Sequence, residues 1–129
     1  MSTVSVISVV DDDESVRAAT SKFLRSHGYT VQAYSSAEDF LRSGRLNDTS
    51  CVIADVQMPG MSGLELLRMM RAQGHGAPFI FITAFPDETT RARALHAGAI
   101  CFLPKPFAGP TLINCIGVAL EGHRREEDT

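Results

Sequence analysis

The chain has 129 residues, of which 44% are hydrophobic, so it can bury the core of one compact domain but has no room for a second. Its formal net charge of −3 and its longest basic run, Arg124-Arg125, offer no basic surface, so we expect no direct nucleic-acid binding by this chain. It lacks a run of about 18 apolar residues and the pattern of a signal peptide, so we expect a cytoplasmic protein that makes no membrane contact.

Five short apolar runs follow one another along the chain. They cover residues 4–10, 29–34, 51–54, 79–82 and 99–103. Most of these runs are continuous rather than alternating, which is typical of strands that are covered on both faces. The sequence therefore predicts five buried strands.

The segments between and after the runs have helical spacing. Apolar residues share a face in four segments: Val16 with Ala19 and Phe23, Ala37 with Phe40, Leu64 with Leu67, and Leu112 with Ile116 and Leu120. A fifth helix is predicted over residues 89–97, where the pattern is less regular. Ser62 and Glu65 form a capping-box pattern, Gly28 follows the first helix, and Pro110 suits the first turn of the last helix. This alternation predicts an α/β fold, a doubly wound parallel sheet with helices on both faces.

Two further features concern the end of the chain and the cysteines. Residues 122–129 are almost wholly polar and follow an apolar helix pattern, so we interpret 1–121 as the domain and 122–129 as a polar tail, either a frayed end or a severed linker.

Cys51, Cys101 and Cys115 are odd in number and widely spaced, and each lies in an apolar segment. We expect all three to be reduced core residues without a disulfide or a metal.

Polar residues with related chemistry follow four of the predicted strands. Asp11 and Asp12 follow the first strand, Asp55 follows the third, Thr83 ends the fourth, and Lys105 comes just after the fifth. In an open parallel sheet, ligands bind outside the carboxyl ends of the strands. We therefore expect these five side chains to gather at one edge of the sheet.

The residue types at this edge indicate a magnesium and phosphate site. Carboxylates that lie close together raise one another's pKa unless a cation is present, and hard oxygen ligands with room for water suit Mg²⁺. Asp55 is a single carboxylate at a strand-to-loop junction and can attack phosphorus to give an aspartyl-phosphate. Lys105 is a compact charge for phosphoryl oxygens, and a cis Lys105-Pro106 bond, which we state as a hypothesis, would fix its direction.

Motifs in the order that the fold requires resemble those of a known family. The paired acids after the first strand are Asp11-Asp12, and the others are Asp55 with Met58-Pro59-Gly60-Met61-Ser62-Gly63, Ile82-Thr83-Ala84 and Lys105-Pro106-Phe107. Over residues 4–121 the chain resembles the receiver domain of two-component response regulators, in the branch found in transcriptional regulators. This resemblance implies a flavodoxin-like (βα)5 fold with strand order 2-1-3-4-5.

The resemblance also implies a role for each site residue. Asp55 would accept a phosphoryl group from a phosphohistidine on a sensor histidine kinase or a phosphotransfer protein. Asp12, Asp55 and the backbone carbonyl of Gln57 would bind Mg²⁺, while Asp11 would act mainly through a bound water. The domain itself would be a regulator with only phosphotransfer and autodephosphorylation chemistry, and not an enzyme.

A switch and its output surface are implied in the same way. Thr83 and Lys105 would hold the phosphoryl oxygens, and Thr83 would move toward them while Phe102 turns inward. The surface of the fourth helix, fifth strand and fifth helix would report this change to a partner or an attached output domain, and a homodimer on phosphorylation is a further expectation. Phe102 lacks the hydroxyl that many relatives carry there.

Phe85 is bulky beside the site, so we predict slow loss of phosphate and faster hydrolysis in an alanine variant.

Other interpretations of the same residues remain. Asp13 and Glu14 suit a helix amino terminus, Asp55 alone suits a turn before Pro59, and Phe102 alone suits a core aromatic residue. A Mg²⁺-dependent phosphohydrolase with Asp55 as nucleophile is one alternative function, although the chain has no insertion large enough for a cap. An interaction module that has lost the chemistry is another.

Overall fold

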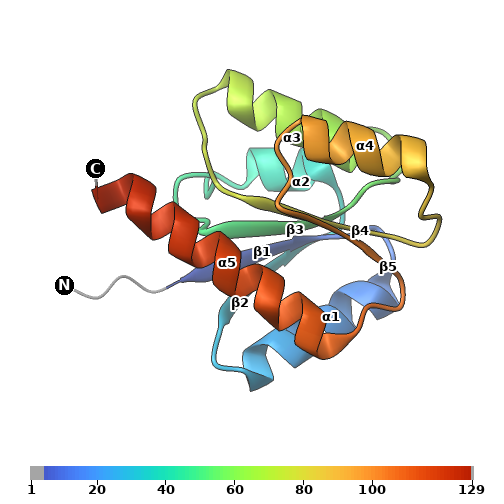
Figure 1. Ribbon diagram of the computed structural model, residues 1–129, viewed down its shortest axis with the longest axis horizontal. Helices are drawn as coiled ribbons and strands as arrows, with labels where there is room; N and C mark the ends of the chain where they lie inside the picture. The colour runs from blue at the N-terminus through green and yellow to red at the C-terminus, as the bar shows by residue number, and fades with distance from the viewer. Residues whose placement is uncertain (1–4, 129) are drawn as a thin grey trace.

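The computed structural model describes residues 5–128, and only the backbone of 123–128. Five parallel strands form one sheet in the order β2-β1-β3-β4-β5 (Figure 1). The strands are β1 Val6–Val10, β2 Thr30–Tyr34, β3 Cys51–Asp55, β4 Phe79–Thr83 and β5 Cys101–Pro104. The predicted fold class and strand order are confirmed, and each observed strand overlaps its predicted run.

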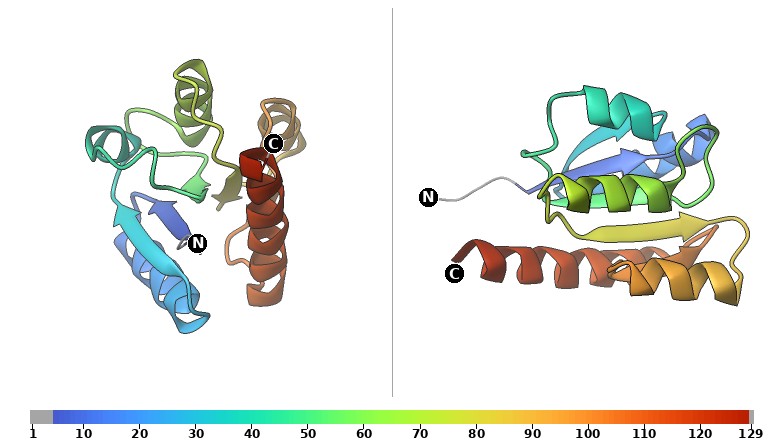
Figure 2. Two further views of the ribbon diagram at one scale, coloured as in Figure 1. Left: turned by 90° about the vertical axis from the view of Figure 1, so that its left-hand side faces the viewer. Right: turned by 90° about the horizontal axis from the view of Figure 1, so that it is seen from above.

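The helices cover the sheet on both faces, as Figures 1 and 2 show. They are α1 Glu14–Ser26, α2 Ala37–Arg42, α3 Gly63–Ala72, α4 Glu88–His96 and α5 Gly109–Asp128. Side chains of α2, α3 and α4 pack in one buried cluster, whereas those of α1 and α5 pack in the other. All side chains of β3 and β4 are buried, because helices lie over both faces of these strands.

Local signals in the sequence set several helix boundaries as predicted. The Ser62 hydroxyl accepts a hydrogen bond from Glu65 N, and the Glu65 carboxylate accepts one from Ser62 N, which completes the capping box of α3. Gly28 follows α1 with a φ of 88°, a conformation that glycine adopts without a steric cost. Pro110 lies in the first turn of α5.

The buried face of α1 differs from the predicted one. Ala19 is exposed, whereas Thr20, Ser21 and Leu24 are buried. Val16 and Phe23 are only partly buried and pack against the cluster that α5 shares. The prediction was wrong because it counted only apolar residues, while two small hydroxyl residues adjoin Leu24 on the face that meets the sheet.

The cysteines are also arranged differently from the prediction. Cys101 on β5 is bonded through a disulfide to Cys115 on α5, and these residues are 14 positions apart. Cys51 is a free, buried cysteine, as predicted, and burial raises the pKa of its thiol to about 12. Counting and spacing missed the pair because its two residues meet only when α5 packs back against β5.

A thiol titration will check this arrangement. We expect no reactive thiol in the native protein under non-reducing conditions, because Cys51 is buried and its thiolate is disfavoured at neutral pH. Unfolding in denaturant should release one thiol, and reduction should raise the count to all three cysteines of the chain. Three thiols in denaturant without a reductant would show that Cys101 and Cys115 are not bonded.

The end of the chain is helical as far as it is described. Helix α5 continues through the polar tail to Asp128, and residue 129 lies outside the described part. The interpretation of 122–129 as a linker stays a prediction. Among the helices within residues 5–128, none combines the length and the apolar character needed to cross a membrane.

Candidate phosphoacceptor site

The carboxyl ends of four neighbouring strands bring the expected residues to one edge of the sheet. Asp11 directly follows β1, Asp55 is the last residue of β3, Thr83 is the last residue of β4, and Lys105 follows β5. Strands β1, β3, β4 and β5 are adjacent and parallel, so their ends lie side by side. The structure therefore places these residues where the strand pattern predicted them.

The Lys105 ammonium joins two buried carboxylates. Its Nζ lies 2.7 Å from Asp55 Oδ2 and 3.1 Å from Asp11 Oδ2, and its side chain is 13% exposed. The backbone N–H of Lys105 donates to the Thr83 carbonyl at 2.7 Å, which ties the β5–α5 loop to the end of β4. The Lys105-Pro106 bond is cis, as hypothesised. One positive charge thus compensates two acids that have little access to water.

Each of the two buried carboxylates uses its other oxygen to accept a backbone hydrogen bond. Asp11 Oδ1 accepts from Asp13 N at 2.9 Å, and Asp55 Oδ1 accepts from Gln57 N at 3.0 Å. These bonds hold both carboxylates in a fixed direction at the strand ends.

Burial and pairing shift the pKa values of two groups at this edge. Burial raises the pKa of Asp11, and the hydrogen bond from Asp13 and the nearby Lys105 ammonium offset this effect only in part. For Lys105, burial lowers the pKa, but the hydrogen bonds and charges of Asp55 and Asp11 outweigh it and raise the pKa overall. Lys105 therefore stays protonated at neutral pH.

The acidic cluster meets the requirements of a hard divalent cation. Asp11, Asp12 and Asp55 each offer a carboxylate oxygen, and these atoms lie within 4.8 Å of one another. Asp11 Oδ2 is buried and faces only the Lys105 ammonium among the described residues, and Asp12 is exposed to solvent. The carbonyl of Gln57 accepts no hydrogen bond in the described part of the chain. All four groups are oxygen donors, which is the set that Mg²⁺ prefers.

The other residues predicted for phosphate binding and switching are Thr83, Phe85 and Phe102. The Thr83 hydroxyl is buried and accepts a hydrogen bond from Phe85 N at 3.0 Å. Phe85 itself is 69% exposed, so its effect on water access stays a prediction. Phe102 on β5 is partly buried against the cluster of α2, α3 and α4. Its role as a switch likewise stays a prediction.

Sequence reasoning missed two residues that position the loop after Asp55. Gly63 begins α3 so close to β3 that an added Cβ would overlap the Asp55 carbonyl oxygen and lie 2.9 Å from the Phe81 ring. A glycine at the first position of a regular helix was the only signal in the sequence. Glu38 of α2 accepts a hydrogen bond from Met61 N at 3.1 Å, and nothing in the sequence indicated this contact.

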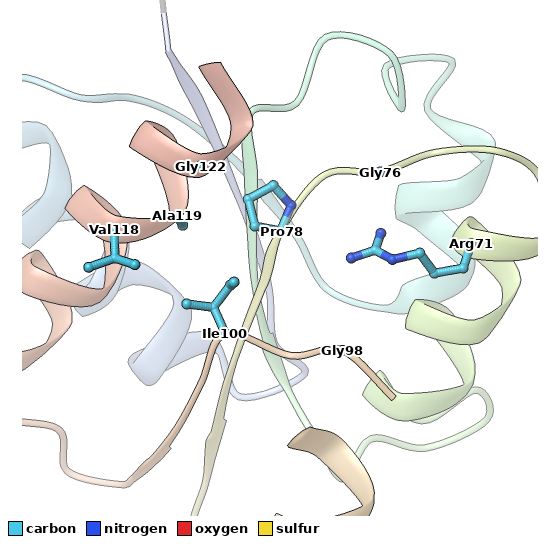
Figure 3. A pocket seen from close by; sticks show the side chains of 8 residues that line it. All are labelled: Arg71, Gly76, Pro78, Gly98, Ile100, Val118, Ala119 and Gly122. Atoms are coloured by element: carbon cyan, nitrogen blue, oxygen red, sulfur yellow. The ribbon is translucent and has the colours of Figure 1, made fainter. Parts of the chain in front are cut away.

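A hollow at the opposite edge of the sheet is separate from this cluster. Its volume is about 150 Å³, and Figure 3 shows its lining around Pro78 and Ile100, which precede β4 and β5. The guanidinium of Arg71 donates to the carbonyls of His75 and Ala77 beside it. Since it lies at the amino ends of the strands, this hollow is not part of the candidate site.

Comparison with known proteins identifies the family. Residues 7–117 match the response regulator receiver domain. The chain belongs to this family. The acidic cluster, Lys105 and strand order therefore belong to a receiver domain of the kind found in phosphorylation-activated signalling proteins.

Individual relatives include response regulators and a transcriptional regulatory protein. The chain is 40% identical over 117 residues to the response regulator protein TodT of Pseudomonas putida, which covers 91% of this chain and 52% of TodT. It is 38% identical over 114 residues to the transcriptional regulatory protein FixJ of Azorhizobium caulinodans, and this match covers 88% of this chain and 54% of FixJ. The chain thus spans about half the length of the curated relatives it matches.

Solved structures agree with this assignment. The response regulator StyR matches with a TM-score of 0.90 and 40% identity, over 97% of this chain and 63% of that one. FixJ-N matches with a TM-score of 0.82 and 35% identity, over 91% of this chain and 94% of FixJ-N. The matched parts of these two structures therefore have the same fold as this chain.

Proposed function

We propose that Asp55 is the phosphoacceptor of a Mg²⁺-dependent signalling switch. The observation that carries this proposal is the cluster of Asp11, Asp12 and Asp55 beside the Lys105 ammonium at the carboxyl edge of the sheet. The donor would be a phosphohistidine on a sensor histidine kinase or a phosphotransfer protein. An Asp55 carboxylate oxygen attacks phosphorus, the P–N bond breaks as the P–O bond forms, and the imidazole leaves with the electron pair.

The residues around Asp55 would have different roles in this phosphoryl transfer. Asp12, Asp55 and the Gln57 carbonyl would hold Mg²⁺, with Asp11 acting through a bound water. The ion would neutralise charge on the phosphoryl oxygens. Lys105 already lies 2.7 Å from Asp55 Oδ2, so its ammonium is placed to pair with an oxygen of the incoming group. The Thr83 hydroxyl, whose oxygen accepts the hydrogen bond from Phe85 N, would donate its own proton to a phosphoryl oxygen.

The output of the switch would be a change on the surface formed by α4, β5 and α5. Thr83 ends β4 directly before the β4–α4 loop, and Phe102 lies on β5, so movement of either residue alters this surface. Because the relatives TodT and FixJ are about twice this length, and FixJ is a transcriptional regulatory protein, we propose that residues 1–121 form the receiver and that 122–129 lead toward an output domain. Self-association of phosphorylated chains through the same surface is part of this proposal.

Phosphorylation by a small donor tests the proposal. We expect one phosphoryl increment in the intact mass after incubation with acetyl phosphate and Mg²⁺, none with EDTA, and none in an Asp55→Asn variant. A thermal melt of that variant controls for folding, and a time course after donor removal follows the lifetime. An equal increment in Asp55→Asn would overturn the assignment of Asp55, and steady consumption of donor without a lasting increment would favour the phosphohydrolase.

A further inference from the structure

The carboxylate of Glu38 reaches from α2 to the loop that follows Asp55. Its Oε2 accepts a hydrogen bond from Met61 N at 3.1 Å, across 23 positions of sequence. The neighbouring Gly60 has a φ of 77°, and a Cβ there would lie 2.5 Å from the same carboxylate oxygen. The loop therefore turns with its backbone against Glu38, and a glycine at the turn leaves room for this close approach.

The β3–α3 loop, residues 56–62, is fixed at both ends by backbone hydrogen bonds. Val56 N donates to the Ile82 carbonyl at 3.2 Å, and Gly63 N donates to the Val56 carbonyl at 3.0 Å. Between these points, Glu38 makes the one side-chain hydrogen bond to the loop from outside β3, the loop and α3 among the described residues. The middle of the loop therefore depends on Glu38 for polar support.

Glu38 is held on a rigid element. Its neighbours in α2, Ala37 and Phe40, are fully buried in the cluster that also holds Met58 of the loop. The helix begins at a Ser36 cap, whose hydroxyl accepts a hydrogen bond from Asp39 N at 3.0 Å. Because α2 is packed against the sheet, the Glu38 carboxylate provides a fixed acceptor for the loop.

The loop carries the candidate backbone ligand for the metal. Gln57 is exposed, its N–H is bonded to Asp55 Oδ1, and it lies three residues before Gly60. Pro59 between them restricts the backbone, so a displacement of the Gly60 turn is passed back toward Gln57. A change in the contact between Glu38 and Met61 would therefore reach Gln57 through only three intervening residues.

We propose that Glu38 is a positioning residue for Mg²⁺ binding, which holds the β3–α3 loop so that the Gln57 carbonyl faces the acidic cluster. This inference rests on the proposed function, since it requires that Asp12 and Asp55 bind Mg²⁺. Glu38 itself does not touch the ion. It acts through the Met61 N–H and the backbone of the loop.

Calorimetric titration of the unphosphorylated chain with Mg²⁺ tests the role of Glu38. We expect Glu38→Ala to weaken Mg²⁺ binding about tenfold, the lower end of the effect seen when a group that orients a metal ligand is lost. Glu38→Gln should bind close to the parent value, because its amide oxygen can accept the same bond from Met61. Glu88→Ala is the charge-matched control, since Glu88 lies on α4 with a side chain that is 82% exposed.

A second readout separates positioning from general stability. In phosphorylation by acetyl phosphate, Glu38→Ala should raise the Mg²⁺ concentration for half-maximal rate and leave the rate at saturating Mg²⁺ near that of the parent. Glu38→Asp, which keeps the charge but shortens the reach, should show the same direction of change and serves if the alanine variant does not fold.

The outcomes distinguish this inference from the proposed function. A parent chain that binds no Mg²⁺ would overturn the proposed function and this inference with it. A parent that binds Mg²⁺, with unchanged affinity in both Glu38→Ala and Glu38→Asp, would overturn the inference alone. Equal weakening in Glu38→Gln and Glu88→Ala would overturn it as well, because the effect would then come from net charge and not from the hydrogen bond.

Discussion

The Lys105→Met variant is expected to lose about 3 kcal/mol of unfolding free energy at neutral pH without divalent cations, because it removes one partner of a buried ion pair. The ammonium contacts Asp55 Oδ2 at 2.7 Å and Asp11 Oδ2 at 3.1 Å. Asp11 is completely buried and Asp55 is 6% exposed, so water cannot replace the lost charge well. Urea unfolding in EDTA, followed by circular dichroism, measures the difference.

The direction of the Lys105 pKa shift means that the contribution of this residue to stability is fully present at neutral pH. The pKa of Lys105 is raised above its ordinary value of 10.5 in the folded chain. Its pairing therefore contributes fully to stability below that ordinary value, and the contribution is lost only as the pH rises through the higher folded pKa. The unfolding free energies of the parent and the variant should consequently differ by a constant amount across neutral pH. The part of this difference that comes from the Lys105 charge should disappear only in strong alkali.

Two controls make the Lys105 result specific. Lys22, the only other lysine, lies exposed on α1, so Lys22→Met should change stability by no more than a few tenths of a kcal/mol. Mg²⁺ should stabilise Lys105→Met more than the parent, because the ion can take over the charge that the ammonium supplied. An unchanged unfolding free energy in Lys105→Met would show that the ammonium does not compensate the buried acids.

The strands and the site edge could be predicted because both follow from local patterns. Continuous apolar runs mark strands that are covered on two faces, and a parallel sheet brings the carboxyl ends of its strands to one edge. Asp11, Asp55 and Lys105 each come within two residues of such an end, so their meeting required only the fold class and no knowledge of long-range contacts.

Features that depend on a specific contact between distant residues could not be predicted. The Cys101–Cys115 bond depends on the rotation of α5 against β5, and the bond from Met61 N to Glu38 depends on where α2 lies relative to the loop. Periodicity gives the face of a helix that is apolar but not its neighbour. The error at Ala19 has the same origin, since small hydroxyl residues are buried wherever the packing of a helix against a sheet requires them.

The Gly63→Ala variant is expected to lose about 2 kcal/mol of unfolding free energy, the middle of the range for an added methyl group in a close-packed interior. The new Cβ would overlap the Asp55 carbonyl oxygen and lie 2.9 Å from the Phe81 ring. Both groups belong to central, fully buried strands, and the Gly63 N–H is itself bonded to the Val56 carbonyl. The helix must therefore move away from β3, and Asp55 must shift with it.

Gly117→Ala is the matched control, because Gly117 is exposed on α5 and a Cβ there meets nothing within 4 Å. It should gain up to about 1 kcal/mol from the higher helix propensity of alanine, so the two glycine variants should change stability in opposite directions. Phosphorylation by acetyl phosphate should slow in Gly63→Ala at a temperature where the variant is fully folded, and stay unchanged in Gly117→Ala. A stable Gly63→Ala variant with the parental rate would show that α3 can withdraw from β3 without disturbing Asp55.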